Sequence, residues 1–115
     1  ACPDLDIYAG NDDHVVPMMA IGGKGVISTI ANVIPRDMHD MCQAFFDGNV
    51  ATARQLQIKV HPIWKAAFCD VNPIPVKTML QLMGMCSGDL RLPLVPPSPA
   101  AYGKIREALE NYGLI

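Results

Sequence analysis

The first part of the chain alternates short apolar runs with patterns of helical period. Apolar side chains dominate residues 6–9 and residues 26–30, which predicts two short strands. A helical pattern follows each strand, over residues 13–20 and from Pro35 until Gly48. Two strand-helix units in tandem are typical of an α/β protein, and they place any chemistry at the carboxyl ends of the strands.

Local signals mark the ends of these two helices. Asp12 or Asp13 is the expected cap of the first helix, because a carboxylate can accept hydrogen bonds from the free N–H groups there. The pair Gly22-Gly23 ends the same helix. The second helix carries an apolar stripe: Met38, Met41, Cys42 and Phe45.

The second part of the chain has helical patterns without strands between them. Asn49 is the expected cap of a long helix that Pro62 bends. Two further helices are predicted over residues 76–83 and residues 99–111, the last one capped by Ser98. A proline-stiffened, extended arm over residues 92–97 separates them. The buried face of the long helix is expected to be Ala53, Leu56, Val60, either Ile63 or Trp64, and Ala67.

The composition narrows the class of protein without identifying a function. Half of the 115 residues are apolar and 17% are charged, as in a globular domain with a core to bury. A net charge of −2 gives no basic surface, so neither nucleic acid nor a membrane is an expected partner. No apolar run approaches the ~20 residues of a membrane span and the opening residues lack a signal-peptide pattern, so we expect a cytoplasmic protein.

Metal chemistry is not expected from this sequence. The four cysteines are scattered without the two-residue spacing of a metal site, and Cys42 falls in an apolar stripe, where it acts as a small hydrophobic residue. Residues 11–14 (Asn-Asp-Asp-His) could form a metal or acid-base cluster. Helix capping is the simpler explanation of these acidic residues. His39 and His61 have no partner at ligand spacing.

Three other features allow both a functional and a structural interpretation. The glycine-rich residues 22–25 precede a strand instead of opening a helix, which favours a tight turn over a phosphate site. Ser28 has no nearby histidine base, so it either lines a pocket or joins a local hydrogen bond. Arg91 could hold a carboxylate ligand or an acidic neighbour, and the sequence favours neither.

Five short motifs of the chain resemble one known family. They are YAGNDD (residues 8–13), GGKGVIS (22–28), ANV (31–33), NPIPVK (72–77) and RLPL (91–94). The same motifs occur in this order and spacing in dihydrodipicolinate synthases, also called 4-hydroxy-tetrahydrodipicolinate synthases, which are class I aldolases of the N-acetylneuraminate lyase superfamily. NPIPVK is the most specific motif, and the resemblance covers essentially the whole chain.

The resemblance implies an α/β fold based on a TIM (β/α)8 barrel. Residues 1–48 would supply the last two strand-helix units of the barrel. Residues 49–115 would form a C-terminal helical extension of about three helices. The order of the predicted elements agrees with this arrangement.

The resemblance also implies an activity for the whole molecule. In the family, a lysine on the sixth strand forms a Schiff base with pyruvate, and the enamine attacks aspartate semialdehyde in lysine and diaminopimelate biosynthesis. A tyrosine and a threonine of earlier strands relay protons. By this resemblance all three lie upstream of this chain, and neither Lys24 nor Lys77 matches the catalytic position. We therefore expect no catalytic residue, metal or cofactor in the chain, and no lyase activity from it alone.

Two residues match substrate-binding positions of the family. The backbone carbonyl of Ile27 would face the bound keto acid, and Gly10 would let the backbone come close to it. The implied partners are pyruvate, aspartate semialdehyde, the missing N-terminal barrel segment and further copies of the complete enzyme, as a tetramer. Two alternatives stay open: another pyruvate-dependent aldolase of the superfamily, and an inactive barrel fragment whose exposed edges self-associate.

Overall fold

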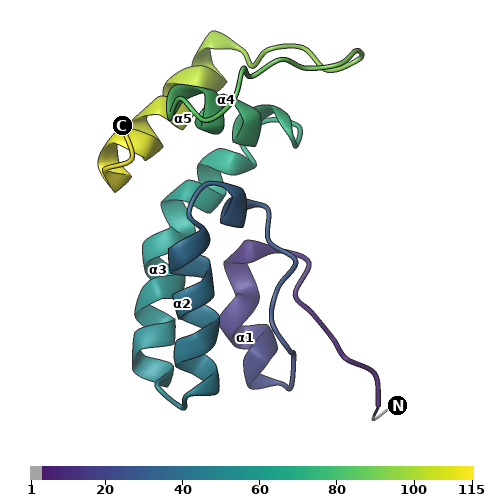
Figure 1. Ribbon diagram of the computed structural model, residues 1–115, viewed down its shortest axis with the longest axis vertical. Helices are drawn as coiled ribbons and strands as arrows, with labels where there is room; N and C mark the ends of the chain where they lie inside the picture. The colour runs from purple at the N-terminus through teal and green to yellow at the C-terminus, as the bar shows by residue number, and fades with distance from the viewer. Residues whose placement is uncertain (1–3) are drawn as a thin grey trace. The chain divides into compact units, whose positions relative to one another are not determined.

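The computed structural model describes residues 4–115 (Figure 1). The chain divides into two compact units, Ala1–His61 and Pro62–Ile115, and the helix α3 (Val50–Ala67) contains the division. The boundary predicted after residue 48 divides the chain by type of element, strand-helix units before it and helices after it. The two compact units divide the chain by packing, so the predicted boundary stays a prediction. Within the described residues, no helix is both long enough and apolar enough to cross a bilayer.

The first unit contains short helices and one long helix next to an irregular pair of extended segments. Its elements in chain order are η1 (Asp12–His14), α1 (Val15–Ala20), η2 (Ile30–Asn32), α2 (Pro35–Phe46) and the first part of α3. In Figure 1, α1 lies beside α2, and an ion pair joins Lys59 of α3 to Asp37 of α2 (2.9 Å). The buried apolar side chains include Val15, Met19, Ile30, Met38, Met41, Ala53 and Val60.

The predicted strands are shorter than expected. Within residues 4–115 they meet in one isolated parallel bridge, between Ala9 and Val26, and no regular strand forms. The second strand was expected to continue to Ile30, but Ile30 already belongs to η2. The N–H groups at this point donate to a carboxylate, as described below, and therefore cannot continue a ladder between strands.

The ends of α1 and α2 follow the predicted signals. Gly22 has a φ of +103°, which closes α1 in a conformation that favours glycine. A Cβ on Gly23 would lie 2.9 Å from the Met18 carbonyl oxygen, so a larger residue does not fit there. Pro35 is the first residue of α2, and the helix ends just before Gly48.

The helix α3 also begins as its sequence predicts. The Asn49 side chain accepts a hydrogen bond from the Thr52 N–H (3.2 Å), so it caps the helix. Ile63 is fully buried and Trp64 is only half-buried, which decides the choice that the sequence left open. The helix continues through Pro62, and the predicted bend stays a prediction.

The second unit packs α4 (Ile74–Leu82) against α5 (Pro99–Tyr112) (Figure 1). The helix α4 begins two residues earlier than predicted. Pro75 lies in its first turn, where the missing N–H has no intrahelical partner to lose. The helix α5 has the predicted bounds, apart from one residue at its end. Both helices contribute buried side chains to the core of the second unit: Ile74, Val76 and Met79 from α4, and Ala101, Ile105 and Leu109 from α5.

Candidate functional site

The extended segments 7–9 and 24–27 pair in parallel through the backbone. Three hydrogen bonds join them: Lys24 N–H to the Ile7 carbonyl (2.7 Å), Ala9 N–H to the Gly25 carbonyl (2.8 Å), and Ile27 N–H to the Ala9 carbonyl (2.9 Å). Because Gly10 directly follows Ala9, this pairing brings Gly10 and Ile27 together at the carboxyl ends of the two segments. The two residues predicted to contact substrate are therefore neighbours. We call residues 7–12 and 24–30 the strand-end region.

Apolar side chains near these strand ends are not covered by the rest of the chain. Ile27 is 73% exposed, Ile7 is 51% exposed and Leu5 is 66% exposed. Of these residues, Ile27 lies at the carboxyl ends of the segments, whereas Ile7 pairs with Lys24 at the amino ends and Leu5 precedes the pairing. The strand ends therefore leave the large apolar side chain of Ile27 uncovered within residues 4–115, and another part of a protein can cover it.

Asp12 holds the two halves of the strand-end region together. Its side chain is only 1% exposed, and Oδ2 accepts hydrogen bonds from the N–H groups of Thr29 (3.1 Å) and Ile30 (3.2 Å). These N–H groups open the short helix η2, and a carboxylate is a favourable partner for such groups. The prediction that Asp12 or Asp13 caps the helix 13–20 is wrong, since neither η1 nor α1 has a side-chain cap. Asp12 caps η2 instead.

The segment that carries Asp12 is fixed by a residue far away in the sequence. Gln57 of α3 donates from Nε2 to the Asp12 carbonyl (2.8 Å), and its Oε1 accepts from the Val16 N–H (2.9 Å). The sequence analysis did not identify Gln57. The sequence gives no signal for it, because residues 54–59 alternate polar and apolar side chains (Arg-Gln-Leu-Gln-Ile-Lys) and a glutamine there is typical of an exposed helix face.

Other polar residues near the strand ends make local contacts. Ser28 Oγ accepts a hydrogen bond from the Ala31 N–H (2.8 Å), which is the local role that the sequence left as one of two possibilities. The part-buried Asp13 carboxylate lies 2.5 Å from His14 Nδ1. No cluster of three or more histidine, cysteine or acidic side chains that could hold a metal ion is found among residues 4–115.

The lysines do not converge on the strand ends. Lys24 is exposed and lies at the opposite, amino end of its extended segment. Lys77 of α4 donates a hydrogen bond from Nζ to the Asp89 carbonyl, in the segment between α4 and the proline-rich arm. Neither contact resembles the desolvated or cation-flanked setting that makes a lysine nucleophilic.

The thiols of Cys42 and Cys69 are not activated. Cys42, Cys69 and Cys86 are free, and Cys2 lies outside the described residues. Burial raises the pKa of the Cys42 thiol above its usual value. Burial also raises the pKa of Cys69, although Lys104 acts in the opposite direction. Both thiols therefore stay protonated at neutral pH.

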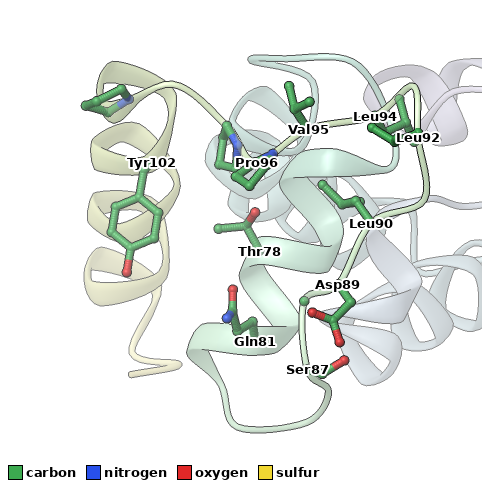
Figure 2. Close-up of a pocket in the computed structure, with 13 residues that line it drawn as sticks. Thr78, Gln81, Ser87, Asp89, Leu90, Leu92, Leu94, Val95, Pro96 and Tyr102 are labelled. Carbon is green, nitrogen blue, oxygen red and sulfur yellow. The ribbon is translucent and has the colours of Figure 1, made fainter.

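A separate cavity of about 800 Å³ lies in the second unit (Figure 2). Thr78 and Gln81 line it from α4, Tyr102 lines it from α5, and the proline-rich arm crosses it in Figure 2. The buried Thr78 hydroxyl already donates to the Ile74 carbonyl (2.9 Å). Arg91 is exposed and is not among the lining residues, so its role stays open. Leu92, Leu94, Val95 and Pro96 line the cavity from the proline-rich arm (residues 92–97), and Ser87, Asp89 and Leu90 line it from the segment between α4 and the arm.

Comparison with known proteins identifies the family. The model of the dihydrodipicolinate synthetase family matches residues 1–112. The 4-hydroxy-tetrahydrodipicolinate synthase of Caldicellulosiruptor saccharolyticus is 47% identical over 98% of this chain, and the match covers 38% of that protein. The chain thus spans about two fifths of the length of this relative, and the match falls in its C-terminal portion.

Solved structures of synthases share the fold of the chain. Dihydrodipicolinate synthase from Thermotoga maritima is 41% identical, with a TM-score of 0.95 over 99% of this chain and 39% of that one. The chloride-inhibited enzyme from Acinetobacter baumannii, complexed with pyruvate, is 33% identical, with a TM-score of 0.91 over 96% of this chain and 38% of that one. The chain belongs to the dihydrodipicolinate synthetase family.

Proposed function

We propose that this chain is the part of a Schiff-base-forming lyase that closes the barrel and adds the helical extension. The complete enzyme condenses pyruvate with aspartate semialdehyde in lysine and diaminopimelate biosynthesis. The observation that carries the proposal is the pairing at the strand ends, which brings Gly10 next to Ile27. The family supports it, and so does the relative from Acinetobacter baumannii, which is complexed with pyruvate.

The two residues have different roles in this proposal. The Ile27 carbonyl oxygen accepts no hydrogen bond from residues 4–115, so it is available to face the bound keto acid. Gly10 leaves space at the same wall, because a Cβ built on it would meet no atom of the chain within 4 Å. Both contribute shape and main-chain contact. A lysine outside this chain supplies the amine that attacks the keto carbon of pyruvate, with loss of water.

The exposed apolar side chains of the strand ends support a partner that completes the barrel. Ile27 would be covered by the preceding barrel segments, which also carry the lysine. The complete enzyme is proposed to be a cytoplasmic homo-tetramer. The chain by itself should not turn over the substrates, whether or not it binds them.

Co-expression with the missing part tests this function. The chain is produced together with the N-terminal portion of the Caldicellulosiruptor saccharolyticus synthase, and pyruvate is added with borohydride, which reduces and traps a Schiff base. Mass spectrometry should find the adduct on the N-terminal polypeptide, and none on the chain alone. If the two polypeptides do not co-purify, or co-purify without a trapped adduct, the proposal is wrong.

A matched pair of glycine variants tests the place of the pocket. Gly10→Ala and Gly103→Ala each add one Cβ where no atom lies within 4 Å and no positive φ is required. In the co-expressed enzyme, Gly10→Ala should raise the pyruvate KM by about tenfold, because a methyl group enters the space of the keto acid. Gly103→Ala lies on α5 and should leave it unchanged. Equal KM values for both variants would remove Gly10 from the site.

A further inference from the structure

The peptide bond that carries the Ile27 carbonyl is fixed on both sides. Before it, the Ile27 N–H donates to the Ala9 carbonyl (2.9 Å). After it, the N–H groups of Thr29 and Ile30 donate to Oδ2 of Asp12 (3.1 and 3.2 Å). Only residue 28 separates the carbonyl group from the carboxylate anchor. These hydrogen bonds hold the backbone on both sides of this carbonyl and so restrict the orientations that it can adopt.

The anchors before and after this peptide come from the same short segment. Ala9 and Asp12 are three residues apart, and Gly10 lies between them. Gln57 fixes the segment from α3 through the Asp12 carbonyl and the Val16 N–H. The wall residue Gly10 and the orientation of the Ile27 carbonyl are thus set by one connected group of hydrogen bonds. All of these contacts lie within the first compact unit.

The Asp12 side chain is an unfavourable choice for stability alone. It is 1% exposed, and its Oδ1 is buried without a hydrogen-bond partner among residues 4–115. A buried side-chain oxygen without a hydrogen-bond donor lowers stability, and a serine could cap a short helix with a single oxygen and leave none unpaired. Sites where a sequence departs from the most stable choice are typically functional.

We propose that Asp12 is a positioning residue for the keto-acid pocket, acting through the backbone of Thr29 and Ile30 on the Ile27 carbonyl. The inference rests on the proposed function of the complete enzyme. Asp12 does not touch substrate, since its side chain is buried and its partners are backbone N–H groups. Its contribution is to hold the backbone around the Ile27 carbonyl in place before pyruvate arrives, so that this wall of the pocket needs no reordering on binding.

Steady-state kinetics of the co-expressed enzyme test this role. Asp12→Ala removes the acceptor of the Thr29 and Ile30 N–H groups and should raise the pyruvate KM by about tenfold, because the backbone that lines the keto-acid pocket at Ile27 is no longer held in place. The KM for aspartate semialdehyde should change much less. Asp12→Asn keeps an acceptor oxygen for the two N–H groups and should stay within about threefold of the wild type. Asp40→Ala removes an exposed carboxylate of α2 and serves as the control.

Amide hydrogen exchange of the chain provides a second, independent measurement. Asp12→Ala should speed up exchange at Thr29 and Ile30, whereas Asp12→Asn and Asp40→Ala should not. Equal exchange at these amides in all three variants would overturn the proposal. So would a folded Asp12→Asn enzyme with a large loss of pyruvate affinity, because its acceptor is retained. This result decides the question even if Asp12→Ala does not fold.

The two proposals can fail separately. If the wild-type assembly traps no pyruvate, the proposed function fails, and the exchange data alone decide whether Asp12 orders residues 28–30. If the wild type traps pyruvate and the pyruvate KM of Asp12→Ala equals that of the wild type, only the positioning role is overturned.

Discussion

The strand-end region and the helices α4 and α5, which are predicted to be part of a helical extension, are stabilised by different kinds of contact. The extension depends on signals close in sequence: Ser98 Oγ accepts from the Ala101 N–H (3.2 Å), and Gly113 ends α5 with a φ of +79°. The strand-end region depends on contacts such as Asp12 with Ile30 and Gln57 with Val16, which are 18 and 41 residues apart in sequence. Contacts between distant residues form only when the segments that carry them have come together in the fold. The strand-end region, which we propose to contact substrate, depends on such contacts.

Removal of a core side chain of the extension should have the largest effect on stability. Ile105 is fully buried on α5, so Ile105→Ala should lower the free energy of unfolding by about 2–5 kcal/mol, through lost burial and the cavity that remains. Urea denaturation followed by circular dichroism measures the change. The control is Ile58→Ala on an exposed position of α3, which should stay within about 0.5 kcal/mol. A similar loss from both variants would show that the extension has no specific core.

Loss of the Gln57 side chain should damage the strand-end region from a distance. Gln57→Ala leaves the Val16 N–H and the Asp12 carbonyl without this partner, which should lower stability by about 1–3 kcal/mol. Hydrogen exchange should become faster at Val16 and not in α5. Gln55→Ala changes an exposed residue of the same helix and serves as the control. Faster exchange throughout the chain would contradict the separation of the two regions.

The cap of α5 should have a smaller and purely local effect. Ser98→Ala removes the acceptor for the Ala101 N–H and should lower stability by about 1 kcal/mol. Ser98→Asp keeps an acceptor and should retain most of the stability. Thermal unfolding of both variants makes the comparison. If the aspartate variant loses as much as the alanine variant, the hydroxyl contact is not what stabilises the start of the helix.

Two glycines should respond to alanine with opposite signs. Gly103 lies inside α5, so Gly103→Ala should raise stability by about 0.5–1 kcal/mol. Gly84 follows α4 with a φ of +72°, so Gly84→Ala should lower stability by about 1 kcal/mol. Neither added Cβ meets an atom within 4 Å, so backbone conformation alone distinguishes the two positions. The same sign for both in denaturation would contradict this explanation.

The helices were predictable because their signals are local. Pro35, Gly48, Asn49, Ser98 and Gly113 each mark a helix end through their own backbone or side-chain chemistry, and the structure confirms all five. The beginning of α4 was two residues late in the prediction. A proline is equally acceptable at several positions of a first turn, so it does not fix the first residue.

The strand-end region was only partly predictable. The family resemblance assigned Gly10 and Ile27 to the substrate pocket, and the pairing makes them neighbours, while their contact with substrate stays a prediction. The partner of Asp12 could not be predicted, because an acidic residue before a helix has an obvious local role, and Thr29 lies 17 residues away. The early end of the second strand could not be predicted for the same reason, because it follows from the hydrogen bonds that Thr29 and Ile30 donate to Asp12.

In the proposed assembly, the exposure of Ile27 depends on whether the chain has joined the rest of the enzyme. A copy that has not joined it displays this side chain, which is 73% exposed, to chaperones and proteases that recognise accessible apolar segments. In a copy that has joined it, the preceding barrel segments would cover the side chain. The residue proposed to contact substrate would thus also direct unassembled copies towards refolding or degradation.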